Sequence, residues 1–144
     1  MKSKLYQIFL ILIIALSGCG TLGSFGIYNI SIDKNQLSKS IDLIYTNYPQ
    51  YKIPEKWKLY DTWKERGYDF LDCRIFYFAV PPEEMFFVSL LSDNLSINKT
   101  SISIRAVCRG NPKWLLQEDF SKDEIERIEL RFKKEILSKI NYDY

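Results

Sequence analysis

Residues 74–91 read RIFYFAVPPEEMFFVSLL, and this stretch decides the fold class. It holds two runs, 74–80 and 85–91, that are rich in the aromatic and branched residues that favour strands. The prolines and glutamates between the runs are typical of a turn. The stretch therefore predicts two antiparallel strands that are apolar on both faces, as expected of strands covered on both sides or of strands with one aromatic surface.

A third strand is expected at 101–107, where SISIRAV alternates between polar and apolar residues. Because successive side chains of a strand point to opposite faces, the alternation predicts one face toward the core and one toward water. The expected inward set is Ile102, Ile104 and Ala106, and the expected outward set is Ser101, Ser103 and Arg105. The segment KWLLQEDF, residues 113–120, is a candidate fourth strand.

The first helix is expected over residues 34–48. Asp33 followed by Gln36 has the spacing of a capping box, which marks the start of a helix. Apolar residues then recur at helical spacing until Pro49 ends the pattern. The preceding residues 27–32, IYNISI, are expected to form an extended lead-in rather than a strand.

A second helix is expected over 55–66, because Pro54 occupies a first helical position and Gly67 a C-terminal cap. Three large aromatic residues follow one another there at three-residue steps, which places them on one side of a helix. They are Trp57, Tyr60 and Trp63. Two interpretations stay open for this aromatic side: part of the core, the more common role, or a surface that binds a ligand or partner.

The C-terminal helix is expected over 122–140, where Ser121 and Glu124 form a second capping box before an apolar stripe. The whole order predicts an α+β fold. It comprises two N-terminal helices, a three- to four-stranded antiparallel sheet, and a C-terminal helix packed on one face.

The N-terminus has the pattern of a secretory signal peptide. Lys2 and Lys4 are followed by an apolar stretch over 5–16 that is broken by a single glutamine. As a helix this stretch spans about 18 Å, which is too short for a hydrocarbon core of about 30 Å. Small residues and Cys19 come next, as at a cleavage site.

Leu16-Ser17-Gly18-Cys19 resembles the lipobox of bacterial lipoproteins, and the resemblance covers residues 1–19 only. It implies a signal peptide at 1–18, a lipid attached to Cys19 with acyl chains such as palmitate, and a membrane anchor of the mature chain. Gly20 stands where aspartate signals inner-membrane retention in the enteric branch of the family. The resemblance therefore implies a protein of the cell envelope, on the outer membrane and facing the periplasm if the cell has one.

The domain organisation follows from this leader. Residues 19–26 are expected to be a lipidated flexible tether, and residues 27–144 a single α+β domain. The leader holds two of the twenty basic residues and none of the eighteen acidic ones, so the mature chain has no net charge. A neutral chain lacks the basic field of nucleic-acid binders, and we expect no nucleic-acid partner.

The chain contains no histidine, which excludes histidine-based catalytic triads, Cys–His dyads and the usual zinc sites. We therefore expect no catalytic residue, no metal and no cofactor. Glu83 and Glu84, with Asp69 and Asp72, are the carboxylates that glycoside hydrolysis would need. In a proline-rich turn, however, Glu83 and Glu84 are expected to be solvated charges.

Cys73 and Cys108 are the thiols that remain after lipidation of Cys19. Export favours a disulfide between them. In a simple meander, however, the first and third strands run parallel, and the two cysteines lie about 20 Å apart at opposite ends. A disulfide needs Cα atoms within about 7 Å, so the bridge is not favoured.

The sequence favours a lipid-anchored envelope protein with a non-catalytic binding or assembly role, whose partner is a protein or glycan of the envelope. Two alternatives stay open. One is a small enzyme that acts on cell-wall or glycan substrates through carboxylates, which requires two acids in one cleft. The other is an immunity-type lipoprotein that neutralises a toxin.

Overall fold

The computed structural model describes residues 24–68, 71–92 and 98–140, which form an α+β fold. The strands are β1 (Ile27–Ile30), β2 (Asp72–Phe78), β3 (Glu84–Ser92), β4 (Thr100–Cys108) and β5 (Trp114–Leu115). The α-helices are α2 (Lys34–Asn47) and α3 (Lys122–Glu135). Short 3-10 helices are η1 (Pro49–Tyr51), η2 (Glu55–Tyr60), η3 (Gln117–Asp119) and η4 (Leu137–Lys139). The predicted signal peptide and Cys19 lie outside the described residues.

The strands form one antiparallel sheet in the order β1-β4-β3-β2, with β5 pairing beside β1 on the same edge of β4. The expected meander of β2, β3 and β4 is confirmed. Residues 27–30 were expected to be a lead-in, but they pair with β4 and are a strand. The candidate fourth strand shrinks to Trp114–Leu115, because the Leu116 N–H donates to the Asp119 carboxylate and the chain turns into η3.

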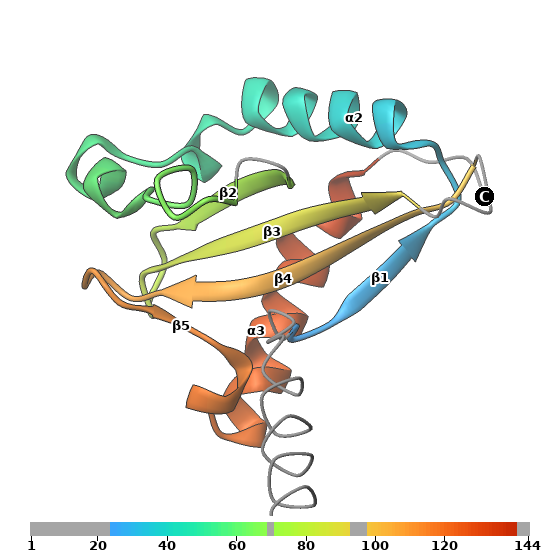
Figure 1. The fold of residues 1–144 in the computed structure, drawn as a ribbon. Coiled ribbons are helices and arrows are strands. Elements are labelled where there is room, and N and C mark those ends of the chain that lie inside the picture. The colour runs from blue at the N-terminus through green and yellow to red at the C-terminus, as the bar shows by residue number, and fades with distance from the viewer. Residues whose placement is uncertain (1–23, 69–70, 93–97, 141–144) are drawn as a thin grey trace, which may run out of the picture.

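Both α-helices cover the same face of the sheet, which confirms the expected packing of the C-terminal helix on one face. In Figure 1, α3 lies behind the strands and α2 along their upper edge. The capping box of α2 is complete, because the Asp33 carboxylate accepts from the Gln36 N–H at 2.9 Å and the Gln36 side chain accepts from Asp33. At α3 the second box is half formed. Ser121 caps the helix, but the Glu124 carboxylate bonds arginines instead of the backbone.

The segment 55–68 covers the opposite face of the sheet and is not the α-helix expected there. It forms η2 and then a turn that ends at Gly67, whose φ of +85° suits a residue without a side chain. A 3-10 helix has three residues per turn, so a three-residue aromatic repeat lies along one side of it more closely than along an α-helix. Trp57 reaches the sheet from η2, and Trp63 reaches it from the turn that follows.

A β-bulge in β4 changes which side chains share a face. In the register with β3, Phe87 pairs with Ala106 and Val88 with Ile104, so Arg105 is the extra residue. Ile102 and Ile104 point toward the helices as expected, but Ala106 belongs to the apolar cluster on the opposite face. The expected inward position of Ala106 is therefore wrong, because a bulge shifts the alternation by one residue.

The domain begins earlier than the expected tether allows. Phe25 is 4% exposed, its N–H donates to the Ile104 carbonyl at 3.1 Å, and its ring packs edge-on against Phe120. The tether therefore overlaps the folded domain at its last residues. Within the described ranges, no helix has both the length and the apolar character needed to cross a membrane.

Candidate binding pocket

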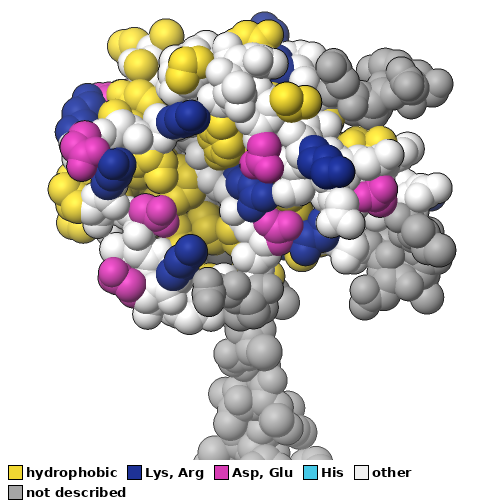
Figure 2. Space-filling model, turned by 90° about the horizontal axis from the view of Figure 1, so that it is seen from above, with side chains coloured by type: hydrophobic (Ala, Val, Ile, Leu, Met, Phe, Trp, Pro, Cys, Tyr) yellow, Lys and Arg dark blue, Asp and Glu magenta, His cyan; other side chains and the backbone are white. Residues whose placement is uncertain are grey.

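An open pocket of about 440 Å³ lies between the end of α2, the turn after η2 and the β2 edge of the sheet. The chain crosses the edge of the sheet beside β2 as it reaches the pocket. Tyr51 packs in the apolar cluster between the sheet and the two α-helices, and Ile53 packs against the apolar cluster on the opposite face. Figure 2 shows hydrophobic side chains gathered on the left of the view, with basic and acidic side chains around them. A volume of this size falls in the range of small-molecule sites.

The floor and back of the pocket are aromatic and aliphatic. The Trp63 indole stacks on Phe87 with ring centroids 3.8 Å apart and planes 8° apart. Tyr68 and Trp114 meet the same indole edge-on, at 5.3 and 5.2 Å. Because three neighbouring rings contact the indole, its orientation is fixed before any ligand arrives. The remaining apolar lining comes from Ile53, Leu71 and Ile75.

The α2 side of the pocket is closed by polar contacts. The Tyr45 hydroxyl donates to the Ile75 carbonyl at 2.6 Å and its ring stacks on Phe76, which ties α2 to β2. Burial, as the largest cause, raises the pKa of Tyr45 above its usual range. Arg74 is held by Asp72 and by the Ser38 hydroxyl, each at 2.5 Å. This wall is thus rigid, and the Arg74 charge is largely neutralised by Asp72.

The charged groups of the described lining are mostly basic. Lys52, Lys64 and Arg74 line the pocket together with one acid, Asp61. Neither lysine forms a salt bridge within the part of the chain that the structure describes. Burial raises the pKa of the Asp61 carboxyl, although nearby Lys64 works in the opposite direction. The pocket therefore offers free positive charge at an apolar cavity.

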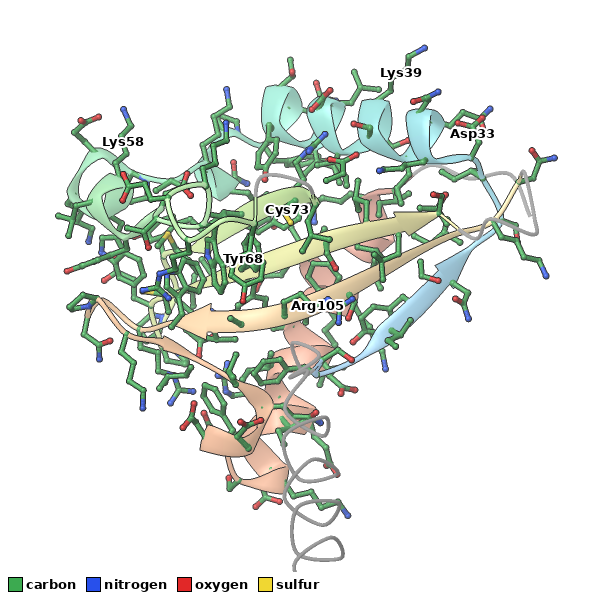
Figure 3. The ribbon with its side chains drawn as sticks, in the orientation of Figure 1. Asp33, Lys39, Lys58, Tyr68, Cys73 and Arg105 are labelled. Atoms are coloured by element: carbon green, nitrogen blue, oxygen red, sulfur yellow. The ribbon has the colours of Figure 1, made fainter. Side chains whose placement is uncertain are left out.

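Cys73 lines the pocket and is a free thiol, as is Cys108. Burial, followed by the nearby Asp72 charge, raises the pKa of Cys73 to about 11. A thiol with so high a pKa is almost entirely protonated at neutral pH and is a poor nucleophile. Figure 3 shows Cys73 on β2, with Tyr68 and Arg105 labelled nearby.

We expect the purified chain without Cys19 to carry two free thiols. Cys73 pairs with Ser89 and Cys108 with Met85, so the two cysteines are separated along β3 by four residues, or about 13 Å. That distance exceeds what a disulfide spans. Mass spectrometry of the denatured, unreduced chain is expected to give the fully reduced mass. Loss of two hydrogens with no thiol reactivity would contradict the strand register.

The three aromatic residues singled out at three-residue steps divide between two roles. Trp57 and Trp63 are 6% and 5% exposed and belong to the apolar cluster opposite the helices. Tyr60 is partly buried and its hydroxyl donates to the Gly110 carbonyl at 3.2 Å. They do not form a joint surface on one side of a helix. Of the three, Trp63 is the one that lines the pocket.

The adjacent carboxylates Glu83 and Glu84 point to opposite faces of the sheet. Glu83 accepts hydrogen bonds from Lys56 and from the Tyr77 hydroxyl, which lower the pKa of its carboxyl. Glu84 was expected to be solvated in a turn, but it is the first residue of β3 and fully buried. The prediction fails because the strand extends one residue further toward the turn than the apolar run. Asp69 lies outside the described residues.

The Glu84 carboxylate is the centre of a cluster that sequence reasoning missed. Arg127 and Arg131, one turn apart on α3, donate to it at 2.5–3.1 Å, and Arg109 donates from the end of β4. The sequence offered one sign of this cluster: Arg127 and Arg131 are four residues apart, which places them on the same side of the helix, beside the apolar stripe. Because every Glu84 oxygen already accepts from a guanidinium, the cluster ties α3 to the sheet and leaves no carboxylate free for proton transfer.

Within the described residues, no three cysteine or acidic side chains are placed to hold a metal ion. Comparison of the chain with models of protein families, with curated proteins and with solved structures gave no match.

Proposed function

We propose that this chain is a lipid-anchored protein of the cell envelope that binds a ligand without transforming it. The observation that carries the binding role is the open pocket of about 440 Å³ with a rigid wall built on the Trp63–Phe87 stack. The anchor rests on the lipobox-like sequence that ends at Cys19. Its place on the outer membrane, facing the periplasm, is part of the same proposal.

The composition of the pocket supports binding over catalysis. The alternative enzyme requires two acids in one cleft, and the described pocket lining contains a single acid, Asp61. The nucleophile of the lining, Cys73, has a raised pKa and no histidine to activate it. Preformed apolar walls with few polar groups are typical of sites that hold a ligand.

The anchor is tested by Cys19→Ala. We expect this variant to stay as an unprocessed precursor or to leave the membrane fraction, because lipidation requires the thiol. Metabolic labelling with a fatty acid, followed by membrane fractionation, measures both effects. Cys73→Ala is the matched control and is expected to keep label and membrane association. Labelling of the Cys19→Ala chain at the level of the unsubstituted protein would contradict the anchor.

The binding role is tested with a neutral apolar probe, N-phenyl-naphthylamine, whose fluorescence rises in apolar sites. All described helices and strands lie within residues 24–140, so the chain from residue 19 with Cys19→Ser retains them and avoids lipid that would absorb the probe. We expect saturable binding at one site. Ile53→Trp and Leu71→Trp, which fill the pocket from two sides, are expected to abolish binding in chains that melt as the parent does.

Binding that survives both pocket-filling substitutions, or no saturable binding at all, would contradict the role of the pocket. The alternative of an immunity-type lipoprotein predicts a charged surface matched to a toxin. The acids Glu83, Asp72, Glu124 and Glu84 are each paired with a nearby base, so these four contribute little free charge to such a surface.

A further inference from the structure

We propose that the natural ligand of this pocket is a small amphipathic anion, with its apolar body against the Trp63–Phe87 wall and its anionic group toward Lys52 and Lys64. The inference rests on the proposed binding function and narrows it to a chemical class. Two features of the pocket carry it: the fixed apolar wall and the positive sign of the free charge on the described lining.

The apolar wall suits a compact body. The Trp63 indole cannot rotate freely, because Phe87 stacks on it at 3.8 Å and Tyr68 meets it edge-on. The guanidinium of Arg66 lies 5.6 Å from the centre of the same indole. A wall fixed in this way loses little side-chain entropy on binding, which favours affinity for a ligand of matching shape.

An N–H donor at this wall lacks an acceptor. The Trp63 Nε1 atom is buried, and among the described residues no acceptor bonds it. Trp114, beside it, donates its own indole N–H to the Tyr60 carbonyl at 2.8 Å. Because the Trp63 Nε1 atom is buried, the contact that Trp63 offers a ligand in the pocket is apolar, through its ring.

The free charge of the lining is positive. Arg74 is already bonded to Asp72 and Ser38, whereas Lys52 and Lys64 have exposed ammonium groups without a salt bridge to a described residue. The single acid of the described lining is Asp61; burial raises the pKa of its carboxyl, and the nearby Lys64 charge works against that rise. Two lysines without a salt bridge to a described residue, beside an apolar cavity, complement a ligand that carries an anionic group on an apolar body.

The test compares two probes that share an apolar body and differ in charge. N-phenyl-naphthylamine is neutral, and anilinonaphthalene sulfonate adds one sulfonate. Both are titrated by fluorescence into the chain from residue 19 with Cys19→Ser. We expect the sulfonate to bind more tightly than the neutral probe, and the difference to shrink as salt rises.

Charge variants test which residues cause the preference for the sulfonate. Lys52→Gln with Lys64→Gln is expected to weaken sulfonate binding by about five- to tenfold, and Asp61→Asn to strengthen it by about two- to fivefold. Both changes are expected to affect the neutral probe less than the sulfonate, so the ratio of the two affinities is the readout. The matched control is Lys39→Gln with Lys58→Gln, which removes the same charge from exposed positions outside the pocket lining. Figure 3 shows both control lysines at the outer side of the molecule.

The outcomes separate this inference from the function on which it rests. The proposal of an anionic ligand is overturned if the neutral probe binds at the pocket and the sulfonate binds no more tightly. It is also overturned if the control pair weakens sulfonate binding as much as the pocket pair does. Either result leaves the binding role intact. Saturable binding of neither probe overturns both. The inference is supported if the sulfonate binds more tightly than the neutral probe, if this difference depends on Lys52, Lys64 and Asp61, and if the control pair leaves it unchanged.

Discussion

We expect Phe132→Ala to lower the free energy of unfolding by about 3–5 kcal/mol, the range for truncating a buried phenylalanine. Phe132 is 0% exposed on α3. Its ring centroid lies 5.7 Å from that of Tyr28, 6.0 Å from Phe76 and 6.5 Å from Phe86. These three partners come from β1, β2 and β3. Truncation therefore opens a cavity between α3 and three strands of the sheet.

Urea unfolding followed by circular dichroism measures this effect. Leu130→Ala is the matched control, since Leu130 lies on the same helix but is 50% exposed. We expect the control to cost about 1 kcal/mol or less, as is usual for exposed positions. Equal losses in the two variants would mean that α3 is not docked on the sheet through its Phe132 side.

The second large effect is expected from Glu84→Gln, at about 3 kcal/mol. Glu84 is fully buried, and Arg109, Arg127 and Arg131 all donate to its carboxylate. Removing the buried negative charge leaves guanidinium groups without their partner, which costs more than the net value of the pair. The effect is at the lower end of the range for buried pairs, because Arg109 and Arg127 remain about 30% exposed and bond Glu124 as well.

Glu83→Gln provides a control one residue away. Glu83 pairs with Lys56, whose side chain is 61% exposed, so this substitution is expected to cost about 1 kcal/mol or less. Unfolding midpoints of the two variants in the same denaturant decide the comparison. If Glu83→Gln proves as costly as Glu84→Gln, the buried arginine cluster does not hold α3 to the sheet.

Strong periodic patterns made much of the fold predictable. The capping box at Asp33 and the two aromatic runs around the turn produced α2, β2 and β3 with bounds within two residues of the prediction. Local chemistry is sufficient at such positions, because each element is favoured both by its own residues and by the core it covers. The α+β class follows from these elements and their order.

Features set by pairing between distant residues were not predictable. The bulge at Arg105 depends on the register with β3, so the sequence of β4 alone carries no sign of it. Glu84 looked solvated beside two prolines, and its burial depends on arginines more than twenty residues away. The pocket depends on the chain passing around β2 between Tyr51 and Ile53, a path that no periodicity encodes.

The three-residue spacing of Trp57, Tyr60 and Trp63 was interpreted as one side of an α-helix, but it fits a 3-10 helix better. Steps of three residues match a 3-10 helix, and η2 has that form. A 3-10 helix would place all three aromatic side chains on one of its sides. The helix ends at Tyr60, however, and the turn that follows brings Trp63 to the sheet separately. That turn is what makes Trp63 a wall of the pocket rather than a continuation of a buried stripe.

The most direct test of the binding pocket is the indole N–H signal of Trp63 in a nitrogen-15 NMR titration with anilinonaphthalene sulfonate. The chain contains three tryptophans, and Trp63→Phe assigns the signal. We expect the Trp63 signal to shift saturably, because the Trp63 ring lines the pocket. The Trp114 signal is expected to move far less, because Trp114 lies outside the described lining and its N–H is bonded to the Tyr60 carbonyl. A Trp63 signal that stays in place while the probe binds, or three signals that shift alike, would contradict the account.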